Sequence, residues 1–169
     1  MIAVRLTKAQ SGVTLVECTV AVAICALFLS SLFVLNTSAM ETLRLARETA
    51  CASQILQQRI ESLRIANWHQ VTDATWLQSN LLNVDAPGAS ELKNLTETVT
   101  LTPYGSSSTS YTQLNRVNGQ ASIVTNNTSL LLENAVEVVW TANYTIAPSD
   151  RPVSRRVVAI LAKGGVAKW

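Results

Sequence analysis

A long apolar run near the N-terminus constrains this chain more than any other feature. Residues 13–35 read VTLVECTVAVAICALFLSSLFVL, in which Glu17 is the only charged residue. As a helix, this run extends roughly 34 Å, enough to cross a hydrocarbon core of about 30 Å. A core helix of a small soluble domain would need a polar face, and this run has none. We therefore predict a transmembrane helix over 13–35.

The residues before the run predict its orientation. Arg5 and Lys8 are the only charged residues upstream of it. Because basic residues beside a span tend to stay in the cytoplasm, we expect a cytoplasmic N-terminus and the rest of the chain on the opposite side of the membrane.

Composition excludes several other classes of protein. The chain has 169 residues, enough for one domain with a core, and only 14% of them are charged. This low charge and a mean hydropathy of +0.23 argue against a disordered chain and against an ordinary soluble enzyme. A net charge of +2 is too small for a nucleic-acid-binding surface.

The apolar helix is expected to continue beyond the membrane. Residues 13–66 contain no Gly and no Pro, so no residue in them breaks a helix. Apolar and small residues recur on one face at steps of three and four, and these are Leu45, Thr49, Ala52, Leu56, Ile60 and Leu63. Charged residues fill the remaining circumference, namely Arg44, Arg47, Glu48, Arg59, Glu61 and Arg64. We predict one helix whose second half, 36–66, packs against a domain. A break at residues 36–38 is the alternative, because these are weak helix formers.

Strand patterns dominate the C-terminal part, 67–169. We expect an irregular connection over 67–95 with at most one short helix, and then strands over 96–102, 111–117, 120–125, 136–146 and 153–162. Asn118-Gly119 predicts a tight hairpin turn. Along 136–146, apolar residues alternate with polar ones, so one face is buried, with Trp140 and Tyr144 as core residues. The predicted fold class is α+β: a long N-terminal helix packed on an antiparallel sheet of about four or five strands.

Residues with catalytic or metal-binding potential are few. The single histidine, His69, has no second histidine or cysteine nearby in the sequence. Cys18 and Cys25 are separated by about 10 Å along a helix, too far to bridge, and with Cys51 they are interpreted as small apolar fillers. Arg155-Arg156 is expected at a solvent-facing strand edge. We expect no catalytic residue, no metal and no cofactor.

A short motif joins the basic leader to the apolar run. It reads Ser11-Gly12-Val13-Thr14-Leu15-Val16-Glu17 and resembles the prepilin-type cleavage and methylation signature of type IV pilins and type II secretion pseudopilins. The resemblance implies that a prepilin peptidase removes leader 1–12 after Gly12 and that the new N-terminal residue, Val13, is N-methylated. Thr14, Leu15 and Glu17 match the family pattern, whereas Val13 stands where the family usually has Phe.

A second tract, 52–64, is similar to the first helix of minor pilins of the pilus-modification type and of minor pseudopilin I. Many major pilins carry a helix breaker where this chain has Val34, and many close a C-terminal loop with a cysteine pair that this chain lacks. The resemblance implies a pilin-like fold, other pilins or pseudopilins as partners, the assembly machinery, and an inner-membrane location with a periplasmic head. It does not distinguish a pilus, a secretion pseudopilus and a DNA-uptake fibre.

Glu17 is the residue whose physical chemistry best agrees with the resemblance. A carboxylate within a span is costly and usually has a partner. Removal of 1–12 would create an amine at Val13, only about 6 Å away along a helix. In a staggered bundle, Glu17 of one subunit then neutralises the Val13 amine of its neighbour and sets the axial register. The alternative is a carboxylate that extends to the cytoplasmic headgroups.

The sequence therefore predicts a non-enzymatic filament subunit, a minor pilin or minor pseudopilin that assembles through its N-terminal helix. Two alternatives remain. One is a domain secreted after ordinary signal-peptide cleavage near Ser38-Ala39. The other is a single-pass protein with a periplasmic head that binds or senses a ligand.

Overall fold

The computed structural model describes residues 14–105, 110–146 and 150–164. The chain divides into two compact units, residues 1–44 and 45–169. The helices are α1 (Leu15–Ile65), α2 (Trp68–Thr72) and α3 (Ala74–Trp76), joined by a π-helix, η1 (Leu77–Leu82), and two 3₁₀ helices, η2 (Ala89–Glu91) and η3 (Thr128–Leu132). The strands are β1 (Lys93–Pro103), β2 (Thr112–Val117), β3 (Gln120–Thr125), β4 (Ala135–Ile146) and β5 (Arg151–Ala162).

Helix α1 is a single element of 51 residues. It passes through residues 36–38 without interruption, so the predicted long helix is confirmed and the alternative with a break there is wrong. Weak helix formers cost only tenths of a kcal/mol each, and the Thr37 hydroxyl donates to the Val34 carbonyl at 2.9 Å, which keeps that side chain within the helix.

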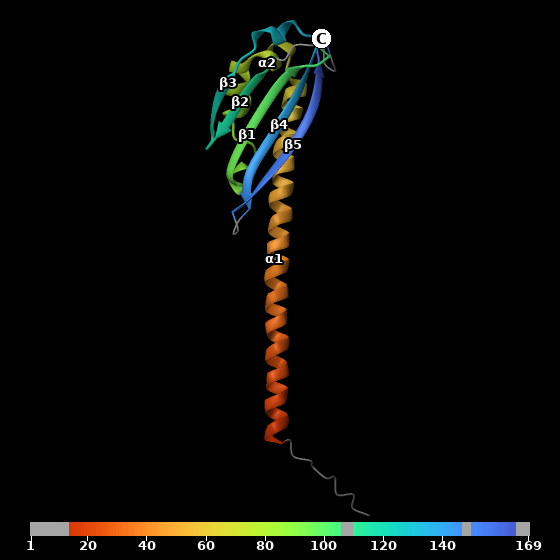
Figure 1. Cartoon of the computed structure of the whole chain (residues 1–169), viewed down its shortest axis with the longest axis vertical. Helices are drawn as coiled ribbons and strands as arrows, with labels where there is room; N and C mark the ends of the chain where they lie inside the picture. Colours follow the sequence, from red (N-terminus) through yellow and green to blue (C-terminus); the bar gives the residue numbers. More distant parts are fainter. Residues whose placement is uncertain (1–13, 106–109, 147–149, 165–169) are drawn as a thin grey trace, which may run out of the picture. The chain divides into compact units, whose positions relative to one another are not determined.

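Five strands form one antiparallel sheet in the order β3-β2-β1-β4-β5 (Figure 1). The predicted α+β class with an antiparallel sheet is confirmed, and each strand lies within three residues of its predicted bounds. The turn between β2 and β3 has the predicted chemistry, because Asn118 and Gly119 take φ values of 52° and 80°, as a type I′ hairpin requires.

The second half of α1 packs on the inner face of this sheet. Leu56, Ile60 and Leu63 share one buried cluster with inward-facing strand residues, namely Val99, Leu101, Leu114, Val136, Val138 and Trp140. A smaller cluster joins Ala52 and Ile55 of α1 to Tyr144 of β4. Alternation along β4 therefore buries Trp140 and Tyr144 as the sequence predicts.

The connection between α1 and β1 is more helical than predicted. It contains α2, α3, η1 and η2, whereas the sequence indicated at most one short helix. Local side-chain bonds begin α2 and α3: Gln70 Oε1 accepts from the Asn67 N–H at 3.0 Å, and Asp73 Oδ1 accepts from the Thr75 N–H at 2.9 Å. Such caps stabilise turns too short to show an apolar period.

Candidate functional site

The first turn of α1 is closed by reciprocal hydrogen bonds between Thr14 and Glu17. The Glu17 N–H donates to Thr14 Oγ1 at 3.2 Å, and Glu17 Oε2 accepts from the Thr14 N–H at 2.9 Å and from the Thr14 hydroxyl at 3.1 Å. This arrangement is a capping box, in which two otherwise unpaired backbone donors are satisfied. The Thr-x-x-Glu spacing signals such a cap, and the sequence interpretation overlooked it.

The predicted processing site lies mostly outside the described residues. Gly12 and Val13, the proposed cleavage and methylation positions, belong to the segment that the structure does not describe. Thr14, Leu15 and Glu17 are described, and all three are exposed. Glu17 thus has a partner within its own chain, and its carboxylate still faces outward.

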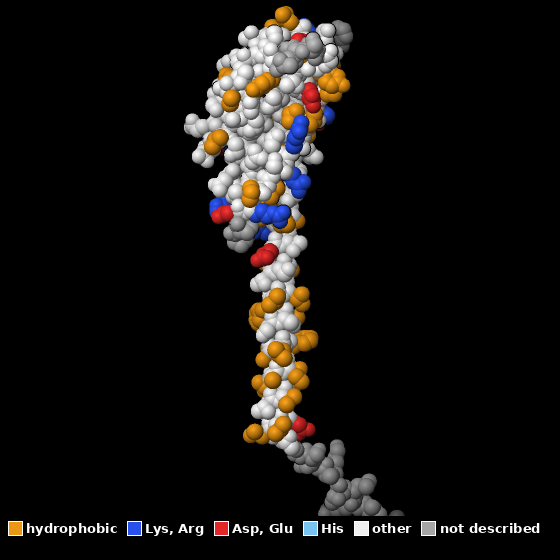
Figure 2. Space-filling view, viewed as in Figure 1, with side chains coloured by type: hydrophobic (Ala, Val, Ile, Leu, Met, Phe, Trp, Pro, Cys, Tyr) orange, Lys and Arg blue, Asp and Glu red, His pale blue; other side chains and the backbone are white. Residues whose placement is uncertain are grey.

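The first half of α1 carries a dense array of exposed apolar side chains. Leu15, Phe28 and Phe33 are each at least 67% exposed, and others follow along the helix, as Figure 2 shows. Among the described residues, α1 is the one helix long and apolar enough to cross a membrane, and no part of its apolar window is buried. A signal sequence would satisfy the same criteria of length and composition.

Four of the five predicted helix-to-head packing residues are buried. Ala52, Leu56, Ile60 and Leu63 are between 0% and 4% exposed. Leu45 differs: it is 43% exposed and belongs to neither core cluster. Close packing on this face of α1 therefore begins nearer to Ala52.

A buried ionic network links α1 to three strands of the sheet. Arg59 of α1 and Arg116 of β2 both donate to Glu97 of β1, and these side chains are at most 5% exposed. The sequence assigns Arg59 and Glu48 to the circumference outside the packing face of α1, but the structure buries both residues. Glu97 lies on the same inward face of β1 as Val99 and Leu101. Because a buried carboxylate is costly without a positive partner, Arg59 of α1 is buried against it.

Glu97 accepts hydrogen bonds from three side chains. Arg59 binds it with two parallel bonds, Nε to Oε2 at 3.0 Å and Nη2 to Oε1 at 2.9 Å. Arg116 Nη1 donates to Oε1 at 3.0 Å, and Trp140 Nε1 donates to Oε2 at 3.1 Å. The carboxylate is therefore a junction for α1, β1, β2 and β4.

Arg59 also fastens the connection that follows α1. Its Nη1 donates to the Leu81 carbonyl and its Nη2 donates to the Val84 carbonyl at 2.9 Å. The guanidinium carbon lies 5.8 Å from the centre of the Trp140 ring, within cation–π range. All the donors of Arg59 that face the core thus have partners.

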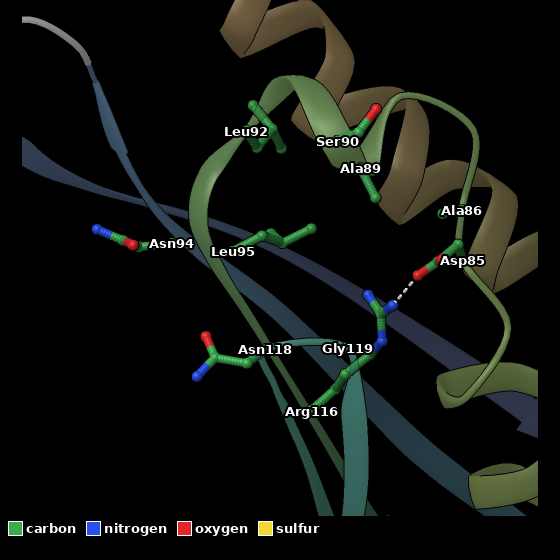
Figure 3. A pocket seen from close by; sticks show the side chains of 10 residues that line it. All are labelled: Asp85, Ala86, Ala89, Ser90, Leu92, Asn94, Leu95, Arg116, Asn118 and Gly119. Carbon is green, nitrogen blue, oxygen red and sulfur yellow. Dashed lines mark hydrogen bonds and ion pairs between the residues drawn. The ribbon is translucent and has the colours of Figure 1, made fainter.

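A cavity of about 410 Å³ opens beside the other end of this network. Its walls are the segment from Asp85 to Leu95 and the β2–β3 hairpin, and Arg116 lies among its lining residues. Asp85 accepts a hydrogen bond from Arg116 Nη2 across this cavity (Figure 3). The Asp85 side chain is 83% exposed, whereas that of Arg116 is 4% exposed.

Other reactive groups are isolated from one another. The Cys51 thiol donates to the Gly88 carbonyl at 3.1 Å, and burial, followed by the negative charge of Glu91, raises its pKa. His69 and the Arg155-Arg156 pair are exposed. Within the described ranges, no three His, Cys, Asp or Glu side chains converge to hold a metal ion.

No family model, curated protein or solved structure matches this chain.

Proposed function

We propose that this protein is a filament subunit, a minor pilin or minor pseudopilin that assembles through the first half of α1. The observation that carries the proposal is the sequence Gly12-Val13-Thr14-Leu15-Val16-Glu17, which stands at the start of an apolar run that can cross a membrane. A prepilin peptidase removes residues 1–12, and Val13 becomes the methylated N-terminus.

The division of α1 into two parts supports this role. Its first half is apolar and exposed, and its second half is anchored in a folded head by Ile55, Leu56 and Leu63. A subunit of this kind waits in the inner membrane with its head in the periplasm and then packs beside similar helices. Removal of Arg5 and Lys8 lowers the Lys and Arg count from 13 to 11, equal to the 11 Asp and Glu. Near-neutral subunits pack side by side with little repulsion.

Glu17 has two partners in this proposal. Before assembly, its carboxylate caps the first turn of its own helix through Thr14. A carboxylate has about four acceptor sites, so Glu17 also accepts from the Val13 amine of a neighbouring subunit without releasing the cap. Neutralisation of the two charges in an apolar bundle fixes the axial register of neighbouring helices.

The processing step is tested by replacing Gly12. We expect Gly12→Val to block leader removal and leave a chain about 1.3 kDa heavier, which is the share of twelve residues in 18.3 kDa over 169 residues. Intact mass and N-terminal sequencing measure this difference. Ser11→Ala is the matched control and should be processed normally. An unprocessed wild-type chain in assembled fibres would refute the proposal.

The role of Glu17 is tested by two substitutions that separate cap from charge. Glu17→Gln keeps an oxygen that caps Thr14 but removes the charge, whereas Glu17→Val removes both. Pairing with a neighbour predicts that both variants insert in the membrane and that both are poorly incorporated into fibres. If Glu17→Gln is incorporated like the wild type, Glu17 is a helix cap only and the pairing is wrong.

A second candidate function is a periplasmic binding domain, either anchored by α1 or released after signal cleavage. The exposed apolar stretch of α1 is as compatible with this function as with a filament subunit. A membrane anchor and a signal sequence satisfy the same criteria of length and apolar composition. The first residue of the mature protein separates the three cases. Val13 supports the filament subunit, a start near residue 40 supports secretion, and Met1 supports a permanent anchor.

A further inference from the structure

The two buried arginines of the ionic network use the same guanidinium edge in different ways. Arg59 fills its Nε and Nη2 donors with both oxygens of Glu97. On Arg116, Nη2 donates to Asp85 Oδ1, and Nε has no hydrogen-bond partner among the residues that the structure describes. The Nε–Nη2 edge can bind a carboxylate with two parallel bonds, as it does on Arg59. On Arg116, one of the two donors of this edge has a partner and the other, Nε, has none among the described residues.

The charges of the network are also unequal. Two buried guanidinium groups share one buried carboxylate, that of Glu97. The remaining positive charge is balanced by Asp85, whose side chain is 83% exposed. A buried cation with an unpaired donor is costly, and an exposed aspartate is a weak partner for it because water competes for its oxygens.

The cavity provides room for another anion at this edge. Its volume of about 410 Å³ is within the range of small-ligand sites. Figure 3 shows the Arg116 guanidinium pointing toward Asp85, with Ser90, Asn94 and Asn118 also lining the cavity. These three side chains are polar and uncharged, and Leu92 and Leu95 supply an apolar wall.

We propose that this cavity binds a carboxylate, which accepts from Nε and Nη2 of Arg116 and displaces Asp85. Arg116 is the one cation among the described lining residues, and Glu97 and Asp85 both lie within hydrogen-bond reach of it. A singly charged carboxylate therefore suits the site better than a phosphate, whose second charge would meet two acidic neighbours. Asp85 occupies the site in the absence of the ligand and is released to solvent when the ligand binds.

The carboxylate comes either from a small acid or from the C-terminus of a peptide, and the chemistry at Arg116 is the same. The site is independent of the proposed filament role, because its residues lie in 85–119 and require neither processing nor assembly. Failure of the carboxylate site would therefore leave the proposed function intact, and the reverse is also true.

The direct test follows the Arg116 Nε–Hε resonance of the full chain in detergent micelles. Arg116→Lys identifies this resonance. Acetate is added to the wild type at constant ionic strength, with chloride as the reference anion. We expect acetate to shift the Arg116 resonance in a saturable manner, while the Arg59 resonance stays in place because its edge is already filled. N-acetyl-glycyl-glycine and its amide form the peptide arm, and only the free acid should bind.

A rescue experiment removes the internal competitor. Asp85→Ala should lower the Tm, and acetate should restore it more than chloride does, with an affinity about tenfold or more above that of the wild type. Glu91→Ala is the matched control, because it removes the exposed partner of the exposed Arg47. Its Tm should respond to acetate and to chloride as the wild type does, so that the stronger response to acetate is specific to Asp85→Ala.

Saturable shifts with acetate, with the peptide acid or with both support the carboxylate site and identify its source. Equal effects of acetate and chloride, equal binding of the peptide amide, or undiminished binding by Arg116→Lys would overturn it. Should Asp85→Ala not fold, Asp85→Asn keeps one acceptor for Nη2. It then tests the same expectation, an affinity above that of the wild type.

Discussion

Substitution of Glu97 by glutamine should be far more damaging than its small change in shape suggests. Glu97 is fully buried and accepts four hydrogen bonds from Arg59, Arg116 and Trp140. In Glu97→Gln, one of the two oxygens becomes an amide that donates, and it then faces two donors. The substitution also leaves two buried guanidinium groups without their shared anion.

The expected loss of unfolding free energy follows from these contacts. Removing one partner of a buried ion pair costs about 3–5 kcal/mol, because the remaining charge stays buried without compensation. A domain of this kind has a total stability of only about 5–15 kcal/mol. We therefore expect Glu97→Gln to lose at least about a fifth of the stability of the head.

Urea unfolding of the full chain in detergent micelles, followed by tryptophan fluorescence, measures this loss. Trp140 donates to Glu97 and is one of the four tryptophans of the chain, so the loss of its hydrogen bond contributes to the change in emission. Glu91→Gln is the matched control: it breaks the exposed pair with Arg47 and should cost less than about 1 kcal/mol. If the two variants lose similar amounts, the network is not the stabilising junction that its geometry indicates.

Three further predictions concern the head. Leu56→Ala should cost about 2–5 kcal/mol in urea unfolding, and Leu45→Ala, at a site 43% exposed, should cost less than half as much; equal losses would show that burial is misassigned. Gly88→Ala should be more destabilising than Gly105→Ala, by about 1 kcal/mol or more. Both glycines have positive φ, but only a Cβ at Gly88 would lie 2.5 Å from Cys51 Sγ, so Cys51→Ala should remove most of the difference. In a Cys18→Ser/Cys25→Ser background, the raised pKa of Cys51 should move its pH–rate profile for alkylation above that of a free cysteine; Glu91→Gln should move it back down, and a profile at or below the free value would contradict the assigned burial.

Much of the fold was readable because its patterns are long and regular. The apolar run and the absence of Gly and Pro in 13–66 predict α1, and the strict alternation of 136–146 predicts β4 with Trp140 and Tyr144 inside. The Asn118-Gly119 turn follows from local chemistry alone. The short helices of 67–95 were missed because they are too short to show an apolar period, and the local bonds that begin α2 and α3 are not part of such a period.

The buried ionic network of Arg59, Glu97 and Arg116 was not predicted, although the sequence contains one sign of it. Glu97 alternates with Val99 and Leu101, which already places a carboxylate on the inward face. Its partners could not be read from the sequence. Arg59 lies 38 residues away and Arg116 lies 19 away, and only the register of β1 with β2 brings Arg116 opposite Glu97. Pairings of this kind depend on tertiary packing, which local periodicity does not record.

The hydrogen bonds of Arg59 restrict how α1 tolerates insertions and deletions. One residue inserted between Ile55 and Arg59 would turn everything before it by about 100° relative to the guanidinium. Either Arg59 would then leave Glu97 and the Leu81 and Val84 carbonyls, or Ala52 and Ile55 would swing away from Tyr144. The rotation of α1 about its axis is thus fixed at two points, by the hydrogen bonds of Arg59 and by the packing of Ala52 and Ile55 on Tyr144. Insertions and deletions should be tolerated between β-strands far more readily than in this short stretch of α1.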